Sequence, residues 1–138
     1  MSKFEIIDHT ADVGLIAYGS TRKEVFINAA IGMFSLITDL EKVIDSRQQE
    51  IIAEADDHEE LLATWLNELL YLFDAENFVF CQFEITRLNH DRLTAIAHGE
   101  RIDLSRHELR TSVKAVTYHQ LKIKKENGSF STKIIFDV

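Results

Sequence analysis

The residues of this sequence best suited to chemistry are the two carboxylates and the imidazole of residues 8–12, Asp-His-Thr-Ala-Asp. They lie between two apolar runs, which predicts a turn that joins two short strands. Taken alone, such a cluster is more typical of a capped turn, in which Asp and Thr side chains accept hydrogen bonds from backbone N–H groups. A role in binding or catalysis therefore needs a partner from elsewhere in the chain.

A second pair of carboxylates stands at the end of the sequence, where the side chain of Asp137 adjoins the terminal carboxylate of Val138. Neighbouring carboxylates repel each other unless one is protonated or a cation lies between them. Oxygen ligands of this kind suit hard cations such as Ca²⁺ or Mg²⁺. If Asp8 and Asp12 reach this terminus, the four groups form an oxygen-rich cation site. Lys114, predicted on the same face as Asp137, would instead neutralise Asp137 by an ion pair, and the residues leave both alternatives open.

Other kinds of reactive site find little support in the sequence. The six histidines include no pair at helical metal-ligand spacing, and one cysteine cannot build a zinc knuckle. Cys81 falls in an alternating strand pattern, which predicts a small buried side chain rather than a nucleophile. His9 by itself is more typical of a local hydrogen-bonding residue. The chemistry that remains is that of oxygen ligands.

Composition predicts one domain that spans residues 1–138, with 46% hydrophobic residues to form its core. The single cysteine and the absence of a signal-like or membrane-spanning apolar run predict a cytoplasmic protein with no membrane association. The formal net charge is −8, which disfavours direct binding to nucleic acid. A cation or a basic protein partner fits this charge better.

The elements that must position these residues are two helices and several antiparallel strands. Apolar residues at helical spacing predict helices over about 21–38 and 57–75, with Thr21 and Glu24 as a capping box for the first. Period-two patterns predict strands over 3–7, 12–19, 46–55, 78–88, 92–101, 112–125 and 130–138. The fold class is α+β, with two principal helices packed against largely antiparallel β-sheet.

The last two strands are predicted to form a long ribbon closed by Asn127-Gly128, the strongest short hairpin signal. With a type I′ turn there, residue 118 should face 137 and residue 117 should face 138. Lys114 and Asp137 then share the more polar face of the ribbon.

The N-terminal run 4–12 resembles the signature of the archease family. The likeness continues through much of the chain and is carried by the segments Ala17-Tyr18-Gly19, Ala29-Ala30 with Met33-Phe34, Thr38-Asp39, Leu66-Asn67-Glu68-Leu69-Leu70-Tyr71, Gly99-Glu100, His107, Val113-Lys114-Ala115-Val116-Thr117-Tyr118-His119 and Asp137-Val138. The Asp-His-Thr-Ala-Asp run and the Lys-Ala-Val-Thr-Tyr-His run are quite specific.

The resemblance implies a single archease-type domain that acts as an accessory protein of RtcB-type RNA ligases in tRNA splicing or RNA repair. Such a protein promotes guanylylation and multiple turnover of the ligase, is not itself an enzyme, and meets RNA only through the ligase. The resemblance further implies a divalent cation site, with Ca²⁺ the usual assignment and Mg²⁺ the other. The residues implied as its ligands are Asp12, Asp137 and Val138.

The remaining site residues follow from the same resemblance. Lys114 matches a family residue important for ligase activation, and Asp8, His9 and Asp39 would support the site. The roles of Glu68 and His107 are open, with a structural role expected. The sequence does not decide the oligomeric state.

Two other functions compete with ligase activation. The same carboxylates would serve a divalent-metal-dependent hydrolase or nucleotide-processing enzyme, which would need an activating base or a deep polar pocket. A general chaperone or an RNA-modification adaptor is the other alternative, and it predicts protection of unrelated client proteins in the absence of any ligase.

Overall fold

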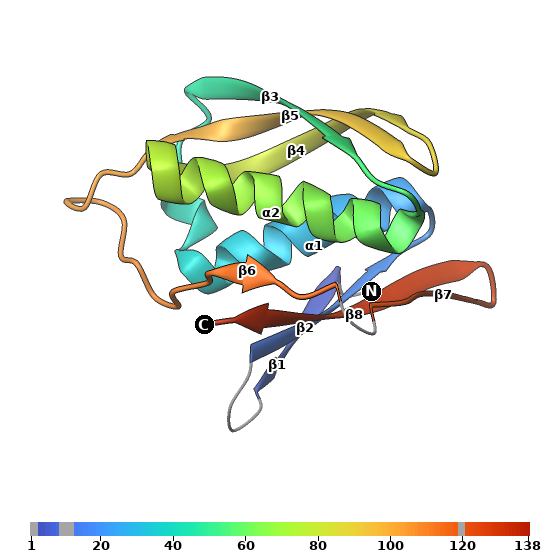
Figure 1. Cartoon of the computed structure of the whole chain (residues 1–138). Helices are drawn as coiled ribbons and strands as arrows, with labels where there is room; N and C mark the ends of the chain where they lie inside the picture. Colours follow the sequence, from blue (N-terminus) through green and yellow to red (C-terminus); the bar gives the residue numbers. More distant parts are fainter. Residues whose placement is uncertain (1–2, 9–12, 119–120) are drawn as a thin grey trace.

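The structure is a computed structural model that describes residues 3–8, 13–118 and 121–138. Two helices lie between two antiparallel sheets, so the molecule has three layers (Figure 1). The N-terminal half contains β1 (Phe4–Asp8), β2 (Val13–Gly19), α1 (Arg22–Ile37), a 3₁₀ turn (Leu40–Lys42), β3 (Arg47–Glu54) and α2 (His58–Glu76). The C-terminal half contains β4 (Phe78–Leu88), β5 (Arg92–Arg101), β6 (Ala115–Val116), β7 (Ile123–Glu126) and β8 (Ser129–Asp137).

The predicted α+β class is confirmed, and the strands divide into two sheets. One sheet has the order β1-β2-β8-β6, with β7 also paired to β8, and the other has the order β3-β5-β4. Among the described residues, three pairings join consecutive strands as hairpins (β1–β2, β4–β5 and β7–β8), and three join strands that are not consecutive (β2–β8, β3–β5 and β6–β8).

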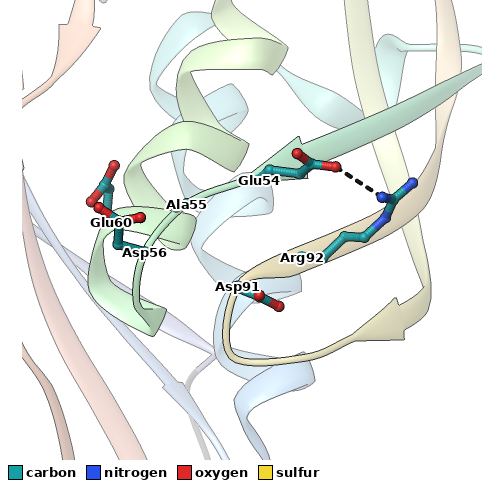
Figure 2. A pocket seen from close by; sticks show the side chains of 6 residues that line it. All are labelled: Glu54, Ala55, Asp56, Glu60, Asp91 and Arg92. Carbon is teal, nitrogen blue, oxygen red and sulfur yellow. Dashed lines mark hydrogen bonds and ion pairs between the residues drawn. The ribbon is translucent and has the colours of Figure 1, made fainter.

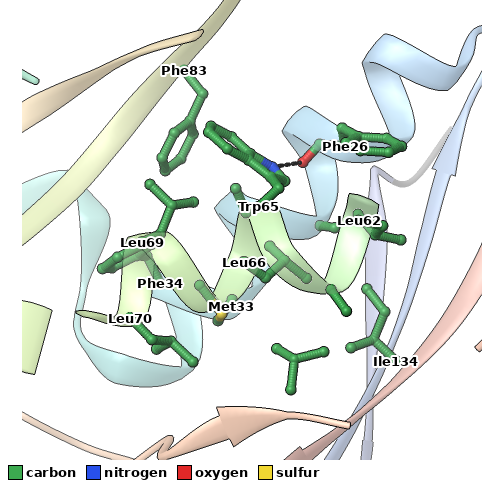
Figure 3. Close-up of a cluster of buried hydrophobic side chains, with 14 of the residues drawn as sticks. Phe26, Met33, Phe34, Leu62, Trp65, Leu66, Leu69, Leu70, Phe83 and Ile134 are labelled. Atoms are coloured by element: carbon green, nitrogen blue, oxygen red, sulfur yellow. Dashed lines mark hydrogen bonds between the residues drawn. The ribbon is translucent and has the colours of Figure 1, made fainter. Parts of the chain in front are cut away.

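The core lies where the helices meet the sheets. Trp65 of α2 is fully buried, and its indole N–H donates to the backbone carbonyl of Phe26 in α1 at 3.0 Å (Figure 3). The same indole packs edge-on against Phe83 of β4, with ring centroids 5.9 Å apart. Burial of large side chains such as these, at about 25 cal/mol per Å² of apolar surface, drives the layers together.

Both helix starts agree with the sequence predictions, with one change of detail. Asp57 caps α2, since its Oδ1 accepts from the Glu60 N–H at 2.8 Å. Thr21 caps α1 by accepting from the Glu24 N–H at 3.2 Å. The Glu24 carboxylate accepts from the backbone N–H of Ser20 at 3.1 Å instead of that of Thr21, so the capping box closes one residue earlier than predicted.

The hairpin of β4 and β5 is confirmed, but its alternation is interrupted beside Cys81. The pairing shifts between Phe80 and Gln82, which leaves Cys81 as the extra residue of a β-bulge. Phe80 and Phe83 are therefore both buried, whereas Cys81 is only half-buried. Burial raises the pKa of the Cys81 thiol, which is the opposite of what an activated nucleophile needs.

The predicted register of the C-terminal ribbon is confirmed near the turn and is wrong farther from it. Asn127 and Gly128 both have positive φ, as a type I′ turn requires, and Lys124 pairs with Ser131 in the predicted register. At the other end, however, Asp137 pairs with Ala115 rather than with residue 118. The predicted strand 112–125 is instead two short strands, β6 and β7. In the segment that joins them, the Thr117 N–H still donates to the Ile135 carbonyl of β8 at 3.3 Å.

Neither helix in the described part of the chain combines the length and apolar character needed to cross a lipid bilayer.

Candidate functional site

Four strands bring the candidate site residues to one end of the five-stranded sheet. Across this end, Asp8 pairs with Val13, Val13 pairs with Phe136, and Phe136 pairs with Val116. Asp137 is the next residue of β8, opposite Ala115. The register therefore gathers the start of β2, the end of β8 and the short strand β6 in one row.

The groups at this end are the exposed Lys114, Asp137 and Val138 and the half-buried Thr117, and we call them the carboxylate end. The backbone carbonyl of Asp137 accepts from the Lys114 N–H at 2.8 Å, which fixes the two main chains side by side. The Asp137 carboxylate is exposed and has a long contact of 3.5 Å with the Thr117 hydroxyl. Val138 is 47% exposed. The carboxylate of Asp137 thus keeps most of its hydrogen-bonding capacity for solvent or a ligand.

The alternative of an ion pair between Lys114 and Asp137 does not occur in the structure. Within the described ranges, the ion pairs shorter than 4.0 Å involve other residues. Lys114 is exposed, and its contact with Asp137 is the backbone hydrogen bond described above.

Asn67 of α2 holds β6 in place, a role that the sequence pattern did not reveal. Its side-chain Oδ1 accepts from the Val116 N–H at 2.9 Å, and its Nδ2 donates to the Val116 carbonyl at 3.3 Å. The amide thereby replaces the neighbouring strand that β6 lacks on this side. A strand of two residues persists here because β8 pairs with one edge and Asn67 satisfies the other.

The chain reaches Lys114 through a loop that closes the C-terminal end of α1. The backbone N–H groups of Arg110 and Thr111 donate to the carbonyls of Ile37 and Leu36 at 2.8 and 3.0 Å. The hydroxyl of the buried Thr38 donates to the Glu108 carbonyl at 2.8 Å. The bonds from Arg110 and Thr111 satisfy carbonyl groups that a helix end leaves without partners, and the bond from Thr38 holds the loop against that end.

Tyr118 ties the residues beyond β6 to the start of α2. Its hydroxyl donates to Asp57 Oδ2 at 3.1 Å, and this bond raises the pKa of Tyr118. The pKa of Asp57 is lowered, mainly by the backbone N–H of Glu60. Tyr118 therefore contacts the residue that caps α2. The prediction from the sequence that Tyr118 faces Asp137 is wrong, because Asp137 pairs with Ala115.

The structure describes only some of the other predicted site residues. His9 and Asp12 lie outside the described residues, and for Asp8 the backbone in β1 is described. Asp39 caps the 3₁₀ turn, where its Oδ1 accepts from the Glu41 N–H at 3.1 Å. Among the described residues, no three His, Cys, Asp or Glu side chains are arranged to hold a metal ion. The proposed ligand set therefore depends on Asp12 and stays a prediction.

The donor chemistry nevertheless fits a hard cation. Asp137 offers an exposed carboxylate, and the exposed Val138 follows it. Ca²⁺ and Mg²⁺ both take oxygen ligands of this kind.

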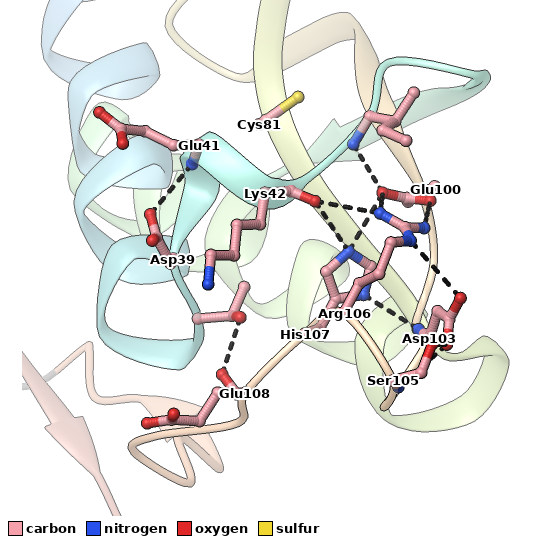
Figure 4. Close-up of polar contacts among 12 residues, drawn as sticks. Asp39, Glu41, Lys42, Cys81, Glu100, Asp103, Ser105, Arg106, His107 and Glu108 are labelled. Carbon is pink, nitrogen blue, oxygen red and sulfur yellow. Dashed lines mark hydrogen bonds and ion pairs between the residues drawn. The ribbon is translucent and has the colours of Figure 1, made fainter.

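A second polar cluster lies beside the 3₁₀ turn and consists of the buried Glu100 and His107 and the more exposed Arg106 (Figure 4). We call it the Glu100 network. Glu100 Oε2 accepts from the Ile44 N–H at 2.6 Å and from Arg106 Nη1 at 3.2 Å, and Glu100 Oε1 accepts from Arg106 Nη2. These contacts, led by the Arg106 hydrogen bond, lower the pKa of Glu100 to about 2.

His107 completes this network and is 2% exposed. Its Nδ1 accepts from the Asp103 N–H at 2.9 Å, so the ring proton belongs on Nε2. Nε2 then donates toward Glu100 Oε2 at 3.1 Å and the Lys42 carbonyl at 3.2 Å. With both nitrogens engaged in the interior, His107 holds the loop together, as the sequence led us to expect.

The structure also has a hollow with several carboxylates, of about 480 Å³, between the end of β3, the start of α2 and the β4–β5 turn. Figure 2 shows Glu54 paired with Arg92 on one side, at 2.8 Å, and Asp56 and Glu60 on the other. The side chains are not gathered around a common point, and within the described residues they form no metal-holding group. This hollow gives no support to the hydrolase alternative.

Comparison with known proteins identifies the family. The profile of the Archease protein family (MTH1598/TM1083) matches residues 4–138. The protein archease of Methanosarcina mazei is 39% identical over 140 residues, covering 99% of this chain and 96% of the relative. The chain belongs to the archease family. A relative from Sulfolobus acidocaldarius, also called protein archease, is 37% identical over the full length of both chains.

Solved structures agree with the archease fold. The solution structure of Methanobacterium thermoautotrophicum protein 1598 matches with a TM-score of 0.80 and 39% identity, and covers all of both chains. The crystal structure of an archease from Thermotoga maritima, described as a possible chaperone, matches with a TM-score of 0.66 and 24% identity. That match covers 96% of this chain and 94% of the other, and at this identity it supports the fold alone.

Proposed function

We propose that this protein is a cytoplasmic accessory factor that activates an RtcB-type RNA ligase and does not itself catalyse ligation. Family membership over residues 4–138 supports an archease-type role. The observation that carries the proposal is the carboxylate end, where Asp137 is exposed, has little internal hydrogen bonding and lies beside the anchored backbone of Lys114.

In this proposal the carboxylate end enters the nucleotide site of the ligase. Asp12, Asp137 and the terminal carboxylate of Val138 would hold a divalent cation, with Ca²⁺ favoured and Mg²⁺ the alternative. Such a cation, when bound, neutralises negative charge on phosphate oxygens. Lys114 adds an ammonium group directed by its fixed main chain, and Asp8, His9 and Asp39 support the loops around the site.

The acidic surface also suits this role. A ligase that holds RNA and a nucleotide must present cationic surface, and a protein with a net charge of −8 is attracted to it. Electrostatic attraction of this kind mainly raises the rate of association.

The test compares Asp137→Asn with Asp74→Asn, which removes the same charge from an exposed position on α2. Guanylylation of a cognate ligase and Ca²⁺ binding by calorimetry are measured for both. We expect Asp137→Asn to weaken Ca²⁺ binding and activation by at least about tenfold, as loss of groups around a metal commonly does. The Asp74 variant should retain both properties.

Full activation by a folded Asp137→Asn protein would refute the proposal. Turnover of nucleotides by the purified protein alone would instead support the enzyme alternative. Suppression of aggregation of unrelated proteins without a ligase would support the chaperone or adaptor alternative.

A further inference from the structure

The face of the five-stranded sheet that points away from the helices carries a cluster of lysines. Successive residues of a strand point to opposite faces, and the buried Thr132 and Ile134 of β8 mark the inner face. Ser131 and Lys133 therefore point outward. In Figure 1 the helices lie on one side of β2 and β8, and no helix covers the other side.

The pairing register brings further lysines to this outer face. Lys124 of β7 pairs with Ser131, and Lys133 pairs with Ile16 of β2. Lys122 precedes β7, and its backbone carbonyl accepts from the Thr132 hydroxyl at 2.6 Å. We call Lys122, Lys124 and Lys133 the lysine face.

The lysine face surrounds a hollow of about 420 Å³. Its described lining consists of the three lysines, Ile16 and the hydroxyl residues Ser131 and Thr132, with no carboxylate. In the described part of the chain, none of these lysines forms an ion pair. Three unpaired ammonium groups around one hollow are unexpected in a protein of net charge −8 and favour an anionic ligand.

The spacing of the lysines favours a chain of phosphates over one phosphate group. Lys122 and Lys124 are two residues apart along an extended segment, which separates them by roughly 7 Å at about 3.3 Å per residue. Lys133 comes from the neighbouring strand. Successive charged groups on a flexible strand can meet these positions one after another, and the adjacent hydroxyl of Ser131 can donate to a phosphate oxygen. The hydroxyl of the buried Thr132 already donates to the Lys122 carbonyl.

A membrane surface fits the same charges less well. The apolar residue in the lining, Ile16, is half-buried, and large exposed apolar side chains such as Leu104 and Tyr71 belong to other parts of the molecule. A few lysines attract an anionic bilayer by only about 1 kcal/mol each, and the remaining acidic surface opposes that attraction.

We propose that the lysine face binds the sugar-phosphate backbone of single-stranded nucleic acid. This goes beyond ligase activation, because the contact is made by the protein alone. It also revises the sequence-based expectation that RNA is reached only through the ligase. The net charge describes the average electrostatic potential of the whole surface, whereas a ligand at the lysine face experiences the local potential of the three lysines. Glu5 of β1, opposite Ile16, marks the acidic border of the cationic area.

The experiment measures fluorescence anisotropy of a short labelled oligouridine RNA with the purified protein over a series of salt concentrations. One variant carries Lys122→Gln, Lys124→Gln and Lys133→Gln. The matched control carries Lys42→Gln, Arg47→Gln and Arg87→Gln, which remove the same charge from exposed positions elsewhere. Thermal unfolding of both variants verifies that they fold.

We expect wild-type binding to weaken steeply with salt. Three lost phosphate contacts should reduce the slope of log affinity against log salt by about 2, since each contributes about 0.7 on single strands. Affinity at low salt should fall at least tenfold in the lysine-face variant and little in the control. An oligodeoxythymidine of equal length should behave similarly, because the hollow reads phosphates and not bases.

Three results would overturn the proposal. The first is no binding by the wild type at low salt, and the second is an equal loss in both variants. The third is unchanged RNA binding by the lysine-face variant together with lost binding to phosphatidylserine vesicles, which would identify a membrane site instead.

Discussion

The carboxylate end and the Glu100 network are both polar clusters built around an acidic side chain, yet they differ in how those side chains are satisfied. Glu100 is 8% exposed and accepts from Ile44, Arg106 and His107. Asp137 is exposed and has one long contact, to Thr117. A carboxylate whose lone pairs are filled from within stabilises the fold, whereas one left open is available to a ligand.

The segment between β5 and β6 links the two clusters, because it carries Arg106 and His107 near its start and Lys114 at its end. The Glu100 network fixes the beginning of the loop that leads to Lys114, and Asn67 fixes its end at β6. The comparison therefore predicts that the first cluster determines stability and the second determines activity.

The largest expected effect on stability comes from Glu100→Gln. The change removes the charge that both terminal nitrogens of Arg106 contact and leaves Arg106 the 3.5 Å ion pair with Asp103. It also weakens the acceptor for His107, so the free energy of unfolding should fall by about 2 to 3 kcal/mol. Chemical denaturation measures it, with Glu50→Gln as a control at an exposed position of β3. Ligase activation per folded molecule should be unchanged. Two results would contradict the assignment of stability to the Glu100 network. One is a Glu100→Gln protein as stable as the control, and the other is a loss of ligase activation as large as that expected for Asp137→Asn.

An intermediate effect is expected from Asn67→Ala, which removes both hydrogen bonds to Val116. Unfolding free energy should fall by about 1 to 2 kcal/mol. Activation should fall as well, because β6 and Lys114 lose one of their two supports. Asp74→Ala on the same helix is the control for both measurements. If activation is fully retained, the position of β6 does not matter to the carboxylate end.

The smallest effect is a change in pH dependence. The pKa of Glu100 is lowered from 4.5 to about 2, so its charged form contributes stability above pH 4.5 that is lost as the pH falls toward 2. The difference in unfolding free energy between the wild type and Glu100→Gln should therefore shrink over this range. A difference that stays constant with pH would show that the charge of Glu100 is not what stabilises the loop.

The helices, their caps and the turn at Asn127-Gly128 were predictable from the sequence because they depend on neighbouring residues. Thr21 and Asp57 cap the helices through bonds to residues three positions ahead, and the turn fixes the register of the strands that leave it. The family also followed from motifs in the chain, whereas the site roles of Asp137 and Lys114 stay predictions.

The tertiary structure alone decided which residues meet when they are far apart in the sequence. The turn predicted residue 118 opposite Asp137, but Ala115 is there, because β6 is also held by Asn67 from a helix distant in sequence. The Glu100 network likewise joins Glu100 to Ile44 and His107 to Lys42, across gaps that no periodicity spans. The lysine face exists because the pairing of β7, β8 and β2 brings separate lysines around one hollow. Composition gives only the number of lysines and the net charge of the chain. Local propensity thus determined the elements, and long-range hydrogen bonding and packing determined which functional groups meet.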